Sequence, residues 1–116
     1  MTIGSDINTA LTAVLSNTYA STLPDAPTWP AIMFEIESER EDGWTIGAEY
    51  EQHIVTVNIM STSKAQIATL RPQIETAMEG VDQYMGLEDH GDADYEDDAR
   101  VYAYYMDFRI RTRELT

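Results

Sequence analysis

Hydrophobic residues recur along this chain with two different spacings, and each change of spacing marks a new element. In two segments, apolar side chains return every three or four residues, which is the spacing of one face of an α-helix. In three other segments, apolar and polar residues alternate, as they do in a β-strand with one buried face. The pattern therefore predicts an α+β fold. It places helices at residues 6–17 and 64–79 and strands at residues 31–37, 49–60 and 101–112.

Local signals define the expected ends of the helices. Ser5 is the expected N-cap of the first helix, because its hydroxyl can accept a backbone N–H. Ser63 and Gln66 have the spacing of a capping box at the start of the second helix, and Gly80 suits its C-terminal end. Pro72 lies inside the second helix, where a proline removes one hydrogen bond and is expected to kink or split the helix.

The alternation within the strands predicts which side chains face the helices. The last strand has the clearest alternation, so we expect it at a central position in the sheet. Residues 84–87 are expected to form a further short strand, and residues 1–116 are expected to make a single domain. The residues expected in the core are Ile32, Phe34, Ile36, Val55, Val57, Ile59, Tyr104, Met106 and Phe108.

Two polar segments separate these elements. Residues 38–48 have the composition of a long hairpin loop, and this loop carries an isolated aromatic residue, Trp44. Residues 88–98 hold seven acids in eleven positions, a density typical of a solvated loop. The acids of this second loop are Glu88, Asp89, Asp92, Asp94, Glu96, Asp97 and Asp98.

The charge of the chain excludes some partners. Twenty-one Asp and Glu stand against seven Lys and Arg, so the formal net charge is −14. Nucleic-acid binding requires Lys and Arg to displace counterions, so direct binding of DNA or RNA is not expected. The acids either line a channel that DNA passes without sticking, or reflect a high-salt source in which screening reduces self-repulsion. We favour salt adaptation as the main cause, with channel lining as a contributor.

Targeting signals and catalytic motifs are both lacking in the sequence. No apolar run reaches the roughly 20 residues of a membrane span, and the first residues do not form a signal peptide, so a soluble protein made inside the cell is expected. The sequence contains no P-loop and no glycine-rich dinucleotide motif. His53 lies in a strand and His90 in the acidic loop, so both are expected to be structural or solvated. We therefore expect neither an enzyme nor a cofactor.

Metal binding by the acidic loop is an alternative that the residues leave open. Carboxylates suit Ca²⁺ or Mg²⁺, but their spacing here does not match the EF-hand pattern. Diffuse attraction of counterions is the preferred interpretation, and a small Ca²⁺-binding or adaptor module remains a rival function. The carboxylates concerned are Asp89, Asp92, Asp94, Glu96 and Asp98.

Several strings of the chain resemble the tail-terminator or tail-completion proteins of long-tailed phages and related tailed viruses. These are WPAIMF at 29–34, YEQHIVTVNIM at 50–60, SKAQI at 63–67 and ARVYAYYMDFRIR at 99–111. In that family, an N-terminal helix leads to a strand introduced by proline, and a long strand then steps into the second helix. The resemblance covers essentially the whole chain. The acidic loop is longer and more charged than the family pattern, so no role carries over to it.

The resemblance implies a mostly antiparallel four-stranded sheet with two helices packed on one face. It also implies a homohexameric ring in the virion tail or neck, assembled in the host cytoplasm. Such a ring would cap the last ring of tail-tube protein, stop tube polymerisation and meet the head–neck connector, while DNA passes through unbound. Another neck or head-completion protein is the rival structural role.

Two groups of residues are candidates for protomer or tube contacts in such a ring. One group lies in the hairpin loop and the other on the last strand, where the arginines could equally pair with acids of the same chain. The candidates are Glu39, Arg40, Trp44, Arg109, Arg111 and Arg113.

Overall fold

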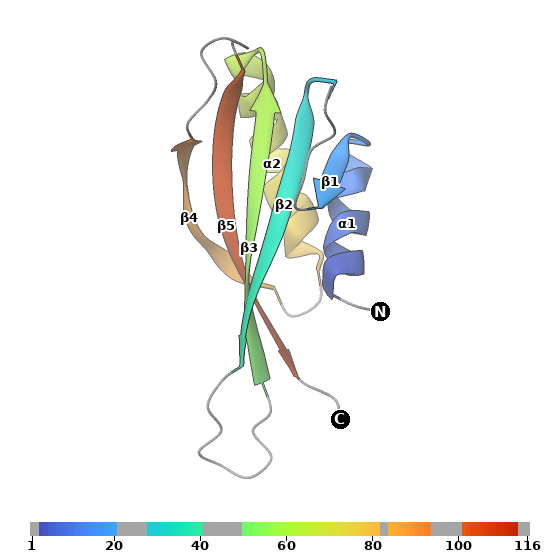
Figure 1. The fold of residues 1–116 in the computed structure, drawn as a ribbon, viewed down its shortest axis with the longest axis vertical. Helices are drawn as coiled ribbons and strands as arrows, with labels where there is room; N and C mark the ends of the chain where they lie inside the picture. Colours follow the sequence, from blue (N-terminus) through green and yellow to red (C-terminus); the bar gives the residue numbers. More distant parts are fainter. Residues whose placement is uncertain (1–2, 21–27, 41–49, 82–83, 94–100, 114–116) are drawn as a thin grey trace.

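The computed structural model describes residues 3–20, 28–40, 50–81, 84–93 and 101–113. Its elements follow one another as helix, two strands, a third strand, helix and two further strands (Figure 1). They are α1 (Ile3–Val14), β1 (Thr18–Ala20), β2 (Ala31–Arg40), β3 (Tyr50–Ser61), α2 (Lys64–Glu79), β4 (Tyr84–Ala93) and β5 (Tyr102–Arg113).

The described strands form one five-stranded sheet in the order β1-β2-β3-β5-β4. β1 runs parallel to β2, and the other neighbouring pairs are antiparallel, so the sheet is mixed. The prediction of a four-stranded, mostly antiparallel sheet is therefore right in fold class but misses β1. This strand has only three residues, too few for an alternation of apolar and polar positions to be recognised. β5 pairs on both sides and lies inside the sheet, as expected.

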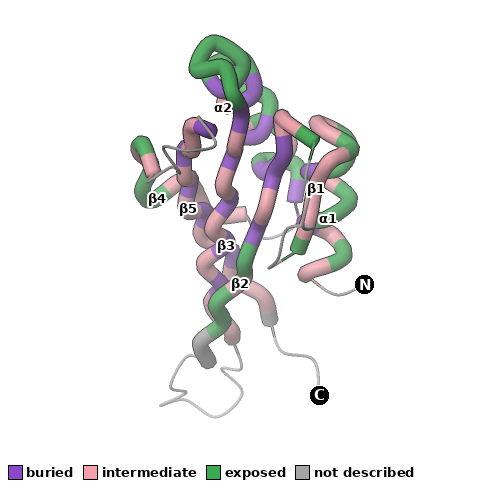
Figure 2. Tube along the Cα trace, turned by 45° about the horizontal axis from the view of Figure 1, so that its top comes forward, coloured by how far each residue is buried: buried purple, intermediate pink, exposed green. Residues whose placement is uncertain are grey.

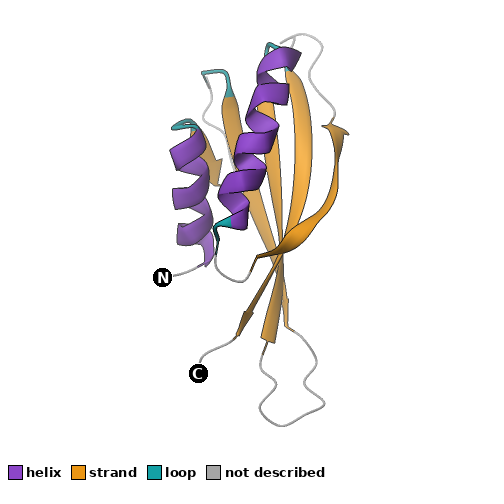
Figure 3. Cartoon of the chain, turned by 180° about the vertical axis from the view of Figure 1, so that it is seen from behind, coloured by secondary structure: helices purple, strands orange, loops and turns teal. Residues whose placement is uncertain are grey.

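Both helices cover the same face of the sheet (Figure 3). Their buried side chains join those of the strands in one hydrophobic cluster. The opposite face of the sheet carries no described helix, and we call it the bare face. The helical members of the cluster are Ile7, Leu11, Ile67, Leu70, Ile74 and Met78.

The side chains predicted to face the helices do so, with one partial exception. Buried and half-buried positions alternate along β3 and β5 (Figure 2). Phe34 is 3% exposed and Phe108 is fully buried, so the predicted register is confirmed at the two residues that test it best. Ile36 is only half-buried and packs against the edge of the core, beside Gly4 in the first turn of α1.

The first helix begins earlier than predicted. It starts at Ile3 and ends at Val14, so Ser5 lies inside the helix and is not its N-cap. Ile3 extends the apolar face of Ile7 and Leu11 by one turn toward the N-terminus, and this packing favours the earlier start. After the helix, the Thr18 hydroxyl donates to the carbonyl of Leu15 at 2.6 Å and turns the chain into β1.

The second helix matches its predicted limits. Ser63 is its N-cap, and its hydroxyl accepts the backbone N–H of Gln66 at 3.3 Å. Pro72 lies within α2, which continues past it as a single helix and is not split. Leu70 and Ile74 are buried on either side of the proline, so the core-facing side of the helix continues past it.

The acidic segment is where the sequence-based prediction fails most clearly. Residues 84–93 form β4, so Glu88, Asp89 and Asp92 lie on a strand and not in a loop. All three are exposed, because β4 is an edge strand. The strand predicted at residues 84–87 is the first part of β4. Irregularities of the β-bulge type between Tyr84 and Gly86 and between Leu87 and Asp89 interrupt the alternation, so the pattern did not predict that the strand continues to Ala93. Asp94, Glu96, Asp97 and Asp98 lie outside the described residues.

The hairpin between β2 and β3 is longer than predicted. β2 continues to Arg40, three residues past the predicted end at residue 37, and pairs with β3 along its whole length. At this end the strands β2, β3 and β5 extend past the helices, and we call the extension the stem (Figures 1 and 3). Trp44 lies outside the described residues. Neither of the two described helices is long and apolar enough to cross a membrane.

Candidate assembly surfaces

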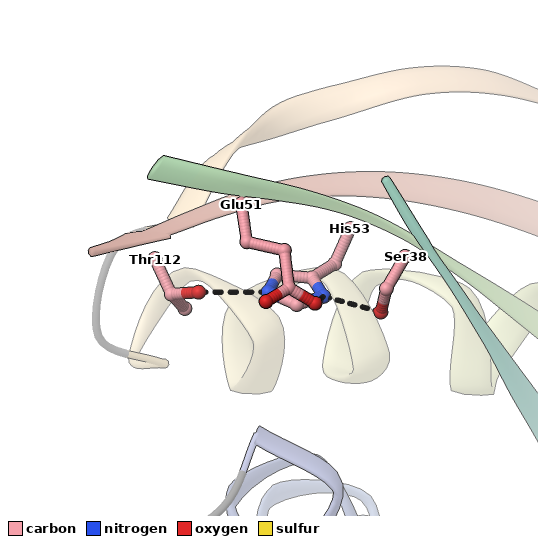
Figure 4. Close-up of polar contacts among 4 residues, drawn as sticks. All are labelled: Ser38, Glu51, His53 and Thr112. Carbon is pink, nitrogen blue, oxygen red and sulfur yellow. Dashed lines mark hydrogen bonds and ion pairs between the residues drawn. The ribbon is translucent and has the colours of Figure 1, made fainter. Parts of the chain in front are cut away.

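A buried histidine joins the three strands near the base of the stem. His53 of β3 is 3% exposed and lies between Ser38 of β2 and Thr112 of β5 (Figure 4). Its Nδ1 is 2.6 Å from the Ser38 hydroxyl, and its Nε2 is 2.8 Å from the Thr112 hydroxyl. A hydroxyl can donate or accept, so both ring nitrogens have suitable partners in the neutral ring. The side chain thus acts as a polar bridge across the stem.

The electrostatic surroundings of His53 favour the neutral ring. Burial lowers its pKa below the ordinary value of 6.5, since removing the charged ring from water is costly. The Glu51 carboxylate, 4.0 Å from Nδ1, acts in the opposite direction and raises the pKa, but burial is the larger effect. The net result is a pKa below its usual value.

This pKa shift predicts a loss of stability in mild acid. Because the folded pKa of His53 lies below 6.5, the unfolded chain takes up the proton first as pH falls. The contribution of the neutral ring is complete above the unfolded pKa and is lost as pH falls toward the folded one. Urea unfolding between about pH 5 and pH 8 should show this loss in the unaltered protein. His53→Gln, which cannot titrate, is the control, and a constant difference between the two curves would contradict the prediction.

The bare face of the sheet is predominantly acidic in the described chain. Two acids on neighbouring strands, Asp89 and Asp107, face each other in the register of β4 and β5. Each accepts a neutral donor: the Tyr105 hydroxyl reaches Asp89 at 2.9 Å, and the Thr56 hydroxyl reaches Asp107 at 2.7 Å. The bond to Asp89 raises the pKa of Tyr105. These hydroxyls hold the carboxylates in place without neutralising them.

Arg109 and Arg111 of β5 lie on the bare face, and Arg109 pairs with an acid of its own chain. Arg109 forms a two-point pair with Glu88 of β4, in which Nη2 lies 3.1 Å from one carboxylate oxygen and Nε contacts the other. Arg111 lies opposite Gln52 in the register of β3 and β5, and Arg113 lies opposite Tyr50 at the end of the stem. For Arg109, the structure therefore shows the intramolecular pairing that the sequence left as an alternative.

The predicted hairpin candidates are placed only by the register of the strands. Glu39 lies opposite Gln52 and Arg40 lies opposite Glu51, so both belong to β2 and to the stem, not to a loop. Arg113 reaches the same end of the sheet from β5. The structure thus brings Glu39, Arg40 and Arg113 to one end of the molecule, far along the strands from Arg109 and Glu88.

The acidic residues do not assemble a metal site within the described ranges. No group of three or more His, Asp or Glu side chains is close enough to hold an ion there. Asp89 contacts Tyr105 on the bare face, whereas Asp92 lines a groove on the helix-covered face. These two carboxylates therefore point away from each other and cannot share a cation.

A groove between α2 and the β4–β5 edge is a feature that sequence reasoning missed. Its walls include Lys64 and Arg71 of α2, Asp92 of β4, and Tyr102 and Tyr104 of β5. The Lys64 ammonium lies 5.0 Å from the centre of the Tyr102 ring, and the Arg71 guanidinium carbon lies 3.9 Å from that of Tyr104. We call this the α2–β4 groove. The only available signal was the spacing of Lys64 and Arg71, two helical turns apart, which says nothing of the tyrosines on a distant strand.

Comparison with known proteins finds one matching family and similar solved structures. The sequence model of the family described as tail completion protein gp17 matches residues 7–113. No curated protein sequence matches the chain. Among solved structures, a chain of the virion of a native gene transfer agent particle superposes with a TM-score of 0.72 at 13% identity, covering 97% of this chain and 95% of that one. At 13% identity, the structural similarity is evidence for the fold alone.

Proposed function

Since the chain belongs to the family of tail completion protein gp17, we propose that it forms a ring that caps the tail tube. The family assignment confirms the resemblance drawn from the sequence. It makes the chain a structural component of the virion, located in the tail or neck. The match over residues 7–113 is the observation that carries the proposal, because it includes every strand and both helices except the first turn of α1.

The architecture is suited to a closed ring. A ring of identical subunits needs two different lateral surfaces that fit each other. The described sheet ends in two unlike edges: β1, which has three residues and runs parallel to its neighbour, and β4, which has ten and runs antiparallel. Unlike edges favour head-to-tail contacts between subunits over symmetric pairs. By the resemblance, six subunits would close the ring.

The stem is the proposed contact with tail-tube protein. It extends past the helices at one end of the long axis, and it carries the positions of Glu39, Arg40 and Arg113 (Figure 1). Trp44, in the connection between β2 and β3, is proposed to add contact area, since tryptophan is enriched among residues that dominate binding energy. The opposite end would face the head–neck connector.

The bare face supports a role for the acids in DNA passage. It carries exposed Glu35, Glu37, Glu88 and Asp89 together with half-buried Asp107, which outnumber the two arginines of this face, Arg109 and Arg111. Duplex DNA carries one negative charge per roughly 1.7 Å, so a sheet face of this kind turned toward the channel would repel it. A high-salt origin would instead distribute carboxylates evenly over the outside. The position of these five acids in an assembled ring separates the two explanations.

The ring is tested by the mass of the assembly. Purified protein mixed with tail-tube protein should give a closed ring of about six copies by native mass spectrometry, and electron microscopy should show it on tube ends. Trp44→Ala should weaken that assembly while leaving the melting temperature of the free subunit unchanged. A mixture with no ring at any concentration would remove the proposal, and unfolding of the variant would place Trp44 in the core.

A further inference from the structure

Two cations of this acidic chain form no ion pair with a carboxylate of the described residues. The chain has three acids for every base, so an exposed cation has many possible partners. Arg109, for example, pairs with the carboxylate of Glu88. Lys64 and Arg71, in contrast, have no carboxylate within 4.0 Å among the described residues, although Asp92 lines the same α2–β4 groove.

Tyrosine rings hold these two cations in place. Lys64 lies over Tyr102 and Arg71 over Tyr104, at 5.0 Å and 3.9 Å from the ring centres. Tyr104 is itself fixed, since it is 7% exposed and its hydroxyl lies 2.5 Å from Nδ1 of His90. A cation over an aromatic face is attracted by the ring, and it keeps its N–H groups available. The groove therefore presents two positioned positive charges to an incoming anion.

The groove opens beside a strand edge with free hydrogen-bonding groups. β4 pairs only with β5 in the described sheet, so its outer edge is unpaired. Residues 89–93 pair in regular register beyond the bulges, next to the part of the groove lined by Asp92 and Ala93. Exposed acids on β4 discourage pairing with the β4 of another copy, because like charges would meet across the junction. The edge thus favours a partner surface different from itself.

We propose that the α2–β4 groove is a contact between ring subunits, in which Lys64 and Arg71 receive carboxylates from a neighbouring copy of this chain. The proposal rests on the ring proposed above and names one side of its lateral contact. A second copy is the occupant that the charges favour, because a chain of net charge −14 supplies carboxylates in excess. The acidic β4 edge disfavours the symmetric arrangement, so the proposed contact is head-to-tail, as ring closure requires.

Matched charge variants test the groove. Lys64→Gln with Arg71→Gln removes two positive charges from it, whereas Asn8→Asp with Thr12→Glu adds two negative charges on the exposed side of α1. Both variants change the net charge by −2. We expect the groove variant to raise the concentration needed for ring formation on tail-tube protein by at least about tenfold. The α1 variant should change it little, and Lys64→Arg with Arg71→Lys should restore assembly.

The results for the two charge variants separate the groove contact from the ring itself. Normal ring formation by the groove variant, or an equal defect in the α1 variant, would overturn the groove contact while leaving the ring intact. Absence of any ring from the unaltered protein would remove the proposed function and the contact together. Asn8, Thr12 and Lys64 are exposed, but Arg71 is half-buried over Tyr104, so melting curves are recorded for every variant and ring formation is compared at a temperature at which all of them are folded.

Cross-linking identifies the occupant. The chain has no cysteine, so Ala68→Cys introduces a single attachment point for a photo-cross-linker in the groove. In rings assembled on tail tubes, we expect an adduct of two 13.1 kDa chains, and no such adduct from Thr12→Cys on α1. An adduct of Ala68→Cys with tail-tube protein would assign the groove to a different partner. The lack of any adduct would show that the groove is not a contact.

Discussion

Replacing Phe108 by alanine is expected to lower the free energy of unfolding by about 3–5 kcal/mol. Phe108 is fully buried at the centre of the hydrophobic cluster. It lies opposite Val55 of β3 and Leu87 of β4, and its ring packs against that of Tyr84 at 6.1 Å between centres. No neighbour can fill the space without moving a strand. Urea unfolding of the free subunit measures the loss.

The control for this prediction comes from the same strand. Tyr105 is an aromatic residue of β5 that lies on the bare face, half-exposed, with one hydrogen bond to Asp89. Tyr105→Ala should cost about 1 kcal/mol or less. Similar losses for Phe108 and Tyr105 would contradict the assignment of the two faces.

Replacing Ser61 by alanine is expected to cost about 1–3 kcal/mol. Ser61 ends β3 and is fully buried, which is unusual for a hydroxyl. Its oxygen accepts the backbone N–H of Ser63 at 3.0 Å, and its proton goes to the side-chain carbonyl of Gln66 at 2.7 Å. Alanine would leave that N–H without its partner at the start of α2.

A double-mutant cycle isolates this effect. Gln66→Ala alone removes one of the two bonds of Ser61, so the two substitutions together should cost less than the sum of their separate effects. Strict additivity in the unfolding free energies would show that the Ser61–Gln66 bond contributes nothing. In a complete capping box, the side chain of Gln66 would bond the backbone N–H of Ser63. In the structure Ser61 takes that place.

The parts of the fold that the sequence predicted are those whose burial is one-sided and regular. β2, β3, β5 and α2 each present one apolar face to one core, so period alone located them within a few residues. Only residues 84–87 of β4 were predicted as a strand, because its irregularities near Gly86 and Asp89 shift the faces within the strand, so Glu88 reaches the bare face and Asp92 the groove. Because a bulge depends on pairing with the neighbouring strand, no local sequence pattern predicts it.

The candidate surfaces were less accessible to sequence reasoning for a related reason. The pairing of Arg109 with Glu88 joins residues 21 positions apart and depends on the order of β5 and β4 in the sheet. The bridge through His53 depends on residues 15 and 59 positions away. The cation–tyrosine contacts of the groove likewise join α2 to β5. A sequence shows which charges exist, but topology decides which of them meet.

The direction of the strands has a mechanical consequence. β2, β3 and β5 run along the longest axis of the molecule, from the stem to the opposite end (Figure 1). Hydrogen bonds between antiparallel strands lie perpendicular to the strands. A pull along that axis therefore loads the whole ladder in shear and shares the force among many bonds, instead of opening them one by one. We expect the subunit to be stiff along this axis and easiest to unzip across it, at the short β1 edge.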